Sequence, residues 1–537
     1  MVLQKKAALF VDGRYTLQAK NEADGTLFGQ YNSGEKSPEA WMAEHLAVKN
    51  CVGYDPKLYT KNMLGRMTSV LQKKNIELVP AENLVDVIWA DRPAAPASRV
   101  FIHDLKYAGE TSLSKRRCMA KRIEAAGAEA CVITVPDAVC WLLNIRGSDV
   151  PCTPLVLCTA ILYAGGAVDL FVAPSRCDAK VRKHLGKDVE LCDPKSLEKK
   201  LNSLKRTCVL CDSNSVPLWF THILKKAGAN IIEGENPCLL AKAIKNPVEL
   251  QGMRNAHIRD GVAVVKLLCW LDRETQKRSV TEMEIADMLL KFRAAHKLFV
   301  EPSFPTIAGS GPNGAIVHYR VLPESNRRLK KGELMLLDSG GQYPDGTTDI
   351  TRTVPVGAPT AEHKDRFTRV LKGHIAIAAA CFPEGTAGSQ LDALARQYLW
   401  QTGLDYDHGT GHGVGCFLGV HEGPQRISKR GGDAALKAGM IVSNEPGYYK
   451  TGEYGIRIEN LVAVTLTSPS PPQGGRRYLA FETITCVPID TRLVDAAMLT
   501  AAEREWLNDY HSWVFDQLRD KLDESEFEWL GKRCKAL

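Results

Sequence analysis

Four acidic residues stand at the ends of, or within, strongly apolar segments in the second half of this 537-residue chain. Apolar runs of this kind predict buried strands, and a lone carboxylate buried at the end of a strand is costly unless it is paired or bound to a metal. A cap, a salt bridge or a turn would explain any one of them, but the four together favour a shared site. They are Asp338 after Leu334–Leu337, Asp349 after the next turn, Glu445 after Ile441-Val442, and Glu459 between Ile458 and Leu461–Val464.

The turn Pro344-Asp345-Gly346 separates Asp338 from Asp349. If Asp345-Gly346 is a two-residue turn, Asp338 faces Thr353 and lies four residues from Asp349 along the ladder, too far for one metal site. A bulged or wider connection would then be required, and the sequence leaves the register open. Arg457 and Glu459 differ by two, so they share one face of a strand.

Histidines in glycine-rich backbone follow the same pattern. His408-Gly-Thr-Gly-His412-Gly-Val-Gly415 is followed by His421, and His318 precedes Asp338. Glycine at every second position lets the backbone approach another group closely. A single histidine is more often structural, but this grouping favours chemistry.

Charge matching suggests the bound group. Four carboxylates balance two divalent cations, and an oxygen-rich ligand set with one imidazole suits Mn²⁺ first, with Zn²⁺, Co²⁺ or Fe²⁺ possible. Two such ions ~3.5–4 Å apart would hold a bridging hydroxide and polarise a carbonyl, as in hydrolytic two-metal sites.

The remaining sequence predicts an α/β protein. Short strands alternate with helices up to residue 245, and longer helices with mixed strands follow. The apolar stretch Thr153–Pro174 contains Ala164-Gly165-Gly166, which favours two buried strands around a turn over a membrane span. The expected strands are Ala7–Val11, Ile76–Val79, Cys131–Val135 and Cys208–Cys211, and the expected helices are Lys115–Glu124, Val248–Trp270, a helix opened by a Thr281/Glu284 capping box, and one that begins at Thr360.

Composition excludes several classes. A net charge of +7 is too small an excess for a dedicated nucleic-acid binder, and 16 irregularly spaced cysteines indicate a reduced, intracellular chain. No targeting segment is visible, so we expect a cytoplasmic protein without a membrane anchor. Gly309–Gly314 matches a dinucleotide fingerprint, but we expect a strand over Ala315–Leu322, which excludes it. The basic cluster Lys115–Arg122 predicts a solvated helix face.

At the acidic and histidine segments the sequence resembles the Xaa-Pro aminopeptidases (aminopeptidase P), metallopeptidases of creatinase-like "pita-bread" fold, in their long eukaryotic cytosolic form. The resemblance covers nearly the whole chain, from Asp12-Gly-Arg-Tyr15 to Trp506-Leu-Asn. Its most specific segments are Gly311–Tyr319, Asp338-Ser-Gly with Asp345–Asp349, His408–Gly415, Val420–Pro424, Glu445–Tyr449 and Gly455–Asn460.

The resemblance implies a role for each site residue. Glu445, besides being one of the metal ligands named below, would move the proton between the water and the leaving group. His318 and His421 would hydrogen-bond the scissile carbonyl and its tetrahedral intermediate, and His408 and Arg457 would line the proline pocket. The implied metal ligands are Asp338, Asp349, His412, Glu445 and Glu459, with Asp349 and Glu459 facing both ions.

It also implies the architecture. Two creatinase-like α/β modules, residues 1–128 and 129–245, would precede a pita-bread catalytic domain of α+β type at 246–537 that forms a homodimer. Members of this type typically carry several dozen residues before Asp-Gly-Arg-Tyr, so we expect the first module to lack its first part.

The implied activity is release of an N-terminal residue from peptides with proline in second position. The alternatives are a prolidase, which takes only Xaa-Pro dipeptides, a non-catalytic binding protein on the same fold, and a metal-free creatinase-type hydrolase. The long N-terminal half favours the aminopeptidase, and the complete ligand set disfavours the last two.

Overall fold

The computed structural model describes residues 1–3, 5–431, 434–467 and 475–537, and the chain forms two compact units. The N-terminal unit comprises Met1–Asp12 and Ala23–Lys242; the C-terminal unit comprises Gly13–Glu22 and Ala243–Leu537. The predicted boundary at residue 128 stays a prediction. In the described part of the chain, no helix is both long and apolar enough to cross a membrane.

The N-terminal unit is built around a six-stranded mixed sheet of order β10-β9-β8-β6-β11-β12. Strands β8 and β9 are antiparallel neighbours, which confirms the two strands predicted within Thr153–Pro174. The elements are β1 (Ala7–Val11), β2 (Phe28–Asn32), α2 (Pro38–His45), β3 (Cys51–Tyr54), α3 (Lys61–Leu71), β4 (Glu77–Pro80), α4 (Leu84–Ile88), β5 (Phe101–Ile102), α5 (Leu105–Ala108), α6 (Ser112–Ala125), β6 (Ala130–Ile133), α7 (Pro136–Leu143), β7 (Ile145–Arg146), β8 (Thr159–Tyr163), β9 (Val168–Phe171), α8 (Ala179–Leu185), β10 (Val189–Cys192), α9 (Leu197–Ser203), β11 (Cys208–Cys211), α10 (Leu218–Ala227) and β12 (Asn230–Glu233), with α11 (Pro237–Ala243) at the junction.

The basic cluster on α6 is only partly solvated. Lys115 and Arg116 are buried, so the prediction of a fully solvated face was wrong for them. Lys115 donates to Asn144 Oδ1 at 2.9 Å, and Arg116 donates to the Gly166 carbonyl at 2.6 Å. Both cations therefore satisfy polar groups inside the unit.

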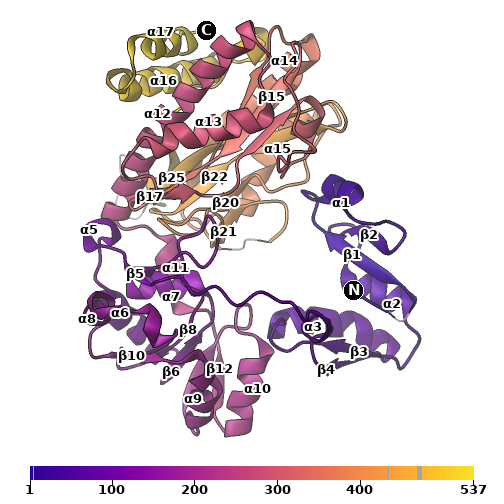
Figure 1. Cartoon of the computed structure of the whole chain (residues 1–537), viewed down its shortest axis with the longest axis vertical. Coiled ribbons are helices and arrows are strands. Elements are labelled where there is room, and N and C mark those ends of the chain that lie inside the picture. The colour runs from indigo at the N-terminus through magenta and orange to yellow at the C-terminus, as the bar shows by residue number, and fades with distance from the viewer. Residues whose placement is uncertain (4, 432–433, 468–474) are drawn as a thin grey trace. The chain divides into compact units, whose positions relative to one another are not determined.

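The C-terminal unit combines long helices with two main sheets, of order β14-β15-β18 and β19-β26-β25-β22-β20-β21. Figure 1 shows α12 and α13 lying across the strands. Its elements are α1 (Thr16–Glu22), α12 (Pro247–Lys277), α13 (Glu282–Ala294), β13 (Glu301–Pro302), β14 (Ile307–Ser310), the 3₁₀ turn η4 (Gly311–Ala315), β15 (Leu334–Ser339), β16 (Gly341–Tyr343), β17 (Gly346–Thr347), β18 (Ile350–Pro355), α14 (Ala361–Ala378), β19 (Cys381–Pro383), α15 (Asp392–Trp400), β20 (Gly411–Gly413), β21 (Glu422–Ile427), β22 (Ile441–Asn444), β23 (Gly447–Lys450), β24 (Tyr454–Arg457), β25 (Asn460–Leu466), β26 (Tyr478–Thr483), α16 (Ala501–Leu518) and α17 (Glu524–Arg533).

Local sequence signals explain the ends of the long helices. Asn246 caps α12, and the predicted capping box of Thr281 and Glu284 opens α13. Thr360 caps α14 as predicted. The strand predicted over Ala315–Leu322 was wrong, because the chain there forms η4 and then an irregular loop.

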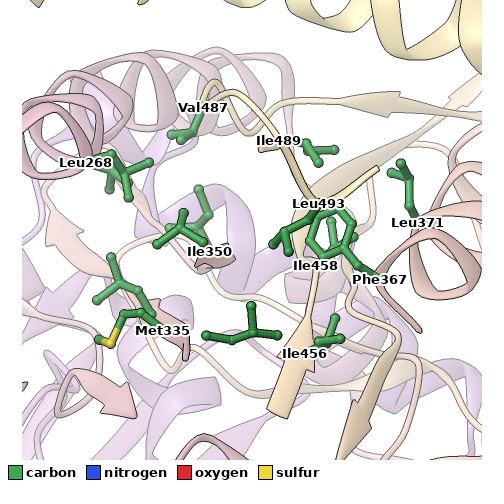
Figure 2. Close-up of a cluster of buried hydrophobic side chains, with 14 of the residues drawn as sticks. Leu268, Met335, Ile350, Phe367, Leu371, Ile456, Ile458, Val487, Ile489 and Leu493 are labelled. Carbon is green, nitrogen blue, oxygen red and sulfur yellow. The ribbon is translucent and has the colours of Figure 1, made fainter. Parts of the chain in front are cut away.

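The largest hydrophobic core lies against one face of the strands that carry the acidic residues. Met335, Ile350, Ile456 and Ile458 point into this core together with side chains from α12 and α14 (Figure 2). Since side chains alternate across a strand, the residues beside them face the other way. The core therefore fixes which face of these strands presents Asp338 and Glu459.

The hairpin register differs from the one considered from the sequence. Gln342 pairs with Thr347 and Tyr343 with Gly346, so the turn is Pro344-Asp345 and not Asp345-Gly346. The same register continues into β15 and β18, where Asp338 faces Thr351. Asp338 is therefore two residues from Asp349 along the ladder, and no wider connection is needed.

The hairpin bends at Gly340, between β15 and β16. A Cβ atom there would meet the Thr348 carbonyl oxygen at 1.9 Å and Ser303 Oγ at 2.1 Å. Only glycine allows these backbones to approach so closely.

We predict that Gly340→Ala separates the two arms of the hairpin and destabilises the C-terminal unit by about 1–3 kcal/mol, because the added methyl overlaps backbone. Thermal unfolding measures the effect. Gly165→Ala is the matched control, since a Cβ there meets nothing within 4 Å. An unchanged unfolding temperature for Gly340→Ala would contradict the packing described here.

Candidate functional site

Backbone pairing brings the predicted acidic residues together. Asp338 on β15 faces Thr351 on β18, and Thr351 forms an isolated antiparallel bridge with Glu459. This bridge joins the two main sheets of the C-terminal unit. Asp349 precedes Thr351 by two residues and so lies on the same side of the strand.

His412 and Glu445 complete the cluster from β20 and the end of β22. His412 Nε2 lies 3.5 Å from Asp349 Oδ2 and 3.4 Å from Glu445 Oε1. The ligand atoms of Asp349, His412 and Glu459 all lie within 4.8 Å of one another. The structure thus brings together all five residues predicted as metal ligands.

The orientation of the His412 ring is set by its own strand. Its Nδ1 lies 3.0 Å from the Gly413 carbonyl oxygen, which only a protonated Nδ1 can bond. This tautomer leaves the Nε2 lone pair directed at the carboxylates, as a metal ligand requires. Ser443 supports the arrangement: its hydroxyl accepts from the His412 backbone N–H at 2.9 Å and donates to Glu445 Oε1 at 3.1 Å.

The hydrogen bonding of three carboxylate oxygens in the cluster indicates whether a metal ion fits there. Asp338 Oδ1, Asp349 Oδ1 and Glu459 Oε1 are buried, and none finds a hydrogen-bond partner among the residues that the structure describes. The second oxygen of Asp338 accepts from Arg457 at 2.6 Å, and that of Glu459 accepts from Thr351 Oγ1 at 2.8 Å. Buried unpaired carboxylate oxygens are expensive. Hard divalent cations are the group that this donor set fits.

The electrostatics of the acids agree with that fit. Burial, together with repulsion from the neighbouring acids, raises the pKa values of Asp349 and Glu459 well above their ordinary range. Burial also raises the pKa of Glu445. Arg457 pairs with Asp338, and the charges of Arg457 and Arg293 act to lower the pKa of Asp349, yet that pKa stays raised, so further positive charge favours the ionised form of all four acids.

The two residues predicted to bind substrate, His408 and Arg457, are joined through Tyr449. The Tyr449 hydroxyl lies 2.8 Å from His408 Nε2 and 2.5 Å from Arg457 Nη1. Burial and the positive charge of Arg457 keep the pKa of His408 well below its usual value, so the ring is neutral. Sequence analysis gave no role to Tyr449, although its place in Glu445–Tyr449 pointed to it.

His421 and His318 lie at the more open side of the cluster. The His421 side chain is exposed, and its ring meets that of His412 edge to face with centroids 4.3 Å apart. The electrostatic influence of the neighbouring His412 ring, followed by desolvation, lowers the pKa of His421. His318 is half-buried, and its Nδ1 lies 2.8 Å from the hydroxyl of Tyr15.

Two residues near the N-terminus were missed as site residues. Tyr15 contacts His318, and the charge of Arg14 contributes to the lowered pKa of His421. Both belong to Gly13–Glu22, the segment that packs with the C-terminal unit. The motif Asp12-Gly-Arg-Tyr15 was the only signal, and nothing local in the sequence connects it to histidines three hundred residues later.

A buried cluster of four carboxylates and an imidazole on this fold is typical of the metal-dependent hydrolases. Family models agree: residues 251–466 match metallopeptidase family M24, residues 91–249 match the creatinase/prolidase N-terminal domain, and residues 477–537 match the C-terminal region of peptidase M24.

Individual relatives indicate which group of M24 metallopeptidases the chain resembles. The chain is 43% identical to aminopeptidase P2 of Arabidopsis thaliana, with all of this chain and 81% of that protein covered, and 42% identical to a probable Xaa-Pro aminopeptidase P of Laccaria bicolor, covering all of this chain and 85% of that one. Among solved structures, X-prolyl aminopeptidase of Caenorhabditis elegans, described as a cytosolic enzyme with a di-nuclear active site, superimposes with a TM-score of 0.94 at 35% identity, covering all of this chain and 89% of that one. An Xaa-Pro dipeptidase of Bacillus anthracis shares the fold, with a TM-score of 0.57 at 22% identity over 71% of this chain and 99% of that one.

The chain therefore belongs to the M24 metallopeptidases, in their Xaa-Pro aminopeptidase P family. The predicted family and fold class, creatinase-like N-terminal modules followed by a pita-bread domain, are thereby confirmed.

The raised pKa values give a test on metal-free protein. An acid whose pKa is raised by folding holds its proton longer in the folded state, so it destabilises that state increasingly as the pH rises above the acid's ordinary value. We predict that chelator-treated Asp349→Asn unfolds at a higher temperature than chelator-treated wild type at pH 8, with a smaller difference at pH 5. After metal is added back, wild type should unfold at a higher temperature than Asp349→Asn. A metal-free variant less stable than wild type at pH 8 would contradict the assigned repulsion.

Proposed function

We propose that the protein is an Xaa-Pro aminopeptidase, which hydrolyses the bond between an N-terminal residue and a following proline. The observation that supports this most directly is the cluster itself: ligand atoms of Asp349, His412 and Glu459 lie within 4.8 Å of one another, and three buried carboxylate oxygens of the cluster have no hydrogen-bond partner among the described residues. Aminopeptidase P2 of Arabidopsis thaliana and the probable Xaa-Pro aminopeptidase P of Laccaria bicolor both match this chain over its full length.

The metal ligands we propose are Asp338, Asp349, His412, Glu445 and Glu459, with Asp349 and Glu459 shared between two ions. Mn²⁺ is the ion we favour, since carboxylates dominate the set, with Zn²⁺ or Co²⁺ as alternatives. When bound, the ions would supply an activated water at neutral pH and polarise the scissile carbonyl.

Glu445 is our candidate for the proton carrier. Burial raises its pKa, which favours taking up a proton, and Ser443 donates to one of its oxygens, which holds the carboxyl in place. The proton would pass from the attacking water to the nitrogen of the leaving proline.

His318 and His421 are proposed to hydrogen-bond the carbonyl oxygen and the negative charge that develops on it. The lowered pKa of His421 keeps that ring neutral, with one N–H available to donate. The bond to Tyr15 fixes Nδ1 of His318 and leaves its Nε2 for the substrate.

His408, Tyr449 and Arg457 would form the wall of the proline pocket. The aromatic rings of His408 and Tyr449 lie edge to face with centroids 5.4 Å apart, and Arg457 fixes the Tyr449 hydroxyl. Such a wall offers apolar area to a proline ring, which presents no N–H for recognition.

The prolidase alternative has less support, because the dipeptidase of Bacillus anthracis shares the fold at only 22% identity and over 71% of this chain. A cytoplasmic location, peptides with proline second as substrates, and a homodimer through residues 246–537 are further parts of the proposal. The cytosolic description of the Caenorhabditis elegans enzyme supports the first, and the homodimer rests on the family resemblance alone.

Substrate length separates the aminopeptidase from the prolidase. We predict that Arg-Pro-Pro is cleaved well, while Arg-Ala-Pro leaves the pocket partly empty and Arg-Pro offers nothing beyond the proline, so both are poor. Side-by-side kinetics on the holoenzyme measure this. If Arg-Pro is the best of the three, the protein is a prolidase.

The roles of the outer histidines separate carbonyl binding from metal binding. His318→Ala and His421→Ala should each lower kcat by about 10²–10³-fold, the usual cost of one lost oxyanion donor, with full metal content. His412→Ala should instead lose metal. Elemental analysis of each variant, together with its turnover, distinguishes the two roles. Metal loss from His318→Ala or His421→Ala would reassign that histidine as a ligand.

A further inference from the structure

Glu282 is a fully buried carboxylate at the first residue of α13, outside the acid cluster. Among the described residues, every group that donates to its carboxylate comes from residues 310–327, which run from the end of β14 through η4 into an irregular loop and carry His318. The donors are the Ser310 backbone N–H at 2.7 Å, Ser310 Oγ at 2.9 Å, Asn313 Nδ2 at 3.0 Å and 3.1 Å, the Tyr319 hydroxyl at 2.9 Å and the Arg327 backbone N–H at 3.0 Å.

These bonds satisfy polar groups at the two ends of the segment, one of which, Ser310, also pairs with Met335 on β15. Buried backbone donors must be satisfied, and here the Glu282 oxygens accept those of Ser310 and Arg327 at the two ends of the loop. Burial, with the Glu282 charge beside it, raises the pKa of Tyr319, which therefore keeps its proton to donate. Tyr319 directly follows His318 and is itself buried.

The opposite side of the loop rests on the substrate-binding elements. Arg457 Nη2 donates to the Val317 carbonyl at 3.4 Å, and a Cβ at Gly455 would meet the Gly314 carbonyl oxygen at 1.7 Å, so β24 and the loop touch through backbone. His318 is thus held between β24 and the anchor at Glu282.

We propose that Glu282 is a positioning residue for the peptidase reaction: its carboxylate fixes the loop that presents the His318 ring to the scissile carbonyl. The inference rests on the proposed role of His318. A negative charge at the start of α13 is also favourable toward the helix dipole, which makes this a stable anchor.

Glu282→Gln is the first test. The amide Nε2 would face donors, and the Arg327 backbone N–H cannot accept, so at least one bond is lost and the loop shifts. We expect kcat to fall by about 10–100-fold, because small misplacement of a reacting group costs that much. KM and metal content should change less than kcat, since the pocket wall and the ligands lie outside residues 310–327 and none of them bonds Glu282. Glu284→Gln is the control: it makes the same change two residues along the same helix, at a partly exposed side chain.

A double-mutant cycle shows whether Glu282 acts through His318. In a His318→Ala background, Glu282→Gln should lower kcat by less than about twofold further. Tyr319→Phe removes a single hydroxyl and should lower kcat by a smaller factor, which should again nearly disappear in the His318→Ala background. This variant replaces Glu282→Gln in the cycle if Glu282→Gln does not fold.

Additive losses in the cycle, or an unchanged kcat in both Glu282→Gln and Tyr319→Phe, would overturn the inference while leaving the proposed function intact. A His318→Ala variant that keeps full turnover would remove the proposed role of His318 and the inference with it.

Discussion

Burying four carboxylates in one cluster is the constraint on which the rest of the C-terminal unit depends. Asp338, Asp349 and Glu459 each keep one buried oxygen without a hydrogen bond to any described residue, and repulsion adds to the desolvation of Asp349 and Glu459. Arg457 compensates only part of this charge. Each unpaired buried charge costs several kcal/mol of folding free energy. The free energy of cation binding must offset this cost in the loaded protein.

The surrounding fold provides that stability from the opposite face of the same strands. Met335, Ile350, Ile456 and Ile458 alternate with the site residues and anchor the strands in the largest core of the chain (Figure 2). The bridge between Thr351 and Glu459 joins the two sheets at the site itself. The acid cluster therefore lies on or beside strands that the core anchors, whereas His318 comes from a loop that Glu282, Tyr15 and Arg457 contact.

Short sequence patterns were enough to predict the features that depend on neighbouring residues alone. The strand ends with their acids, the cap of α13 and the face shared by Arg457 and Glu459 all follow from the sequence of a few neighbouring residues. The family resemblance supplied the roles. The hairpin register was not predicted, because the Asp345-Gly346 dipeptide by itself favours a two-residue turn, whereas the structure places the turn at Pro344-Asp345. The contacts of Tyr15, Tyr449 and Glu282 were also beyond reach, because each joins segments far apart in the chain.

The most direct test of a two-metal site is anomalous diffraction at the manganese edge from crystals grown with Mn²⁺. The account predicts two manganese peaks per chain, both within the cluster of Asp338, Asp349, His412, Glu445 and Glu459. A single peak, or peaks away from the three unpaired carboxylate oxygens, would contradict it.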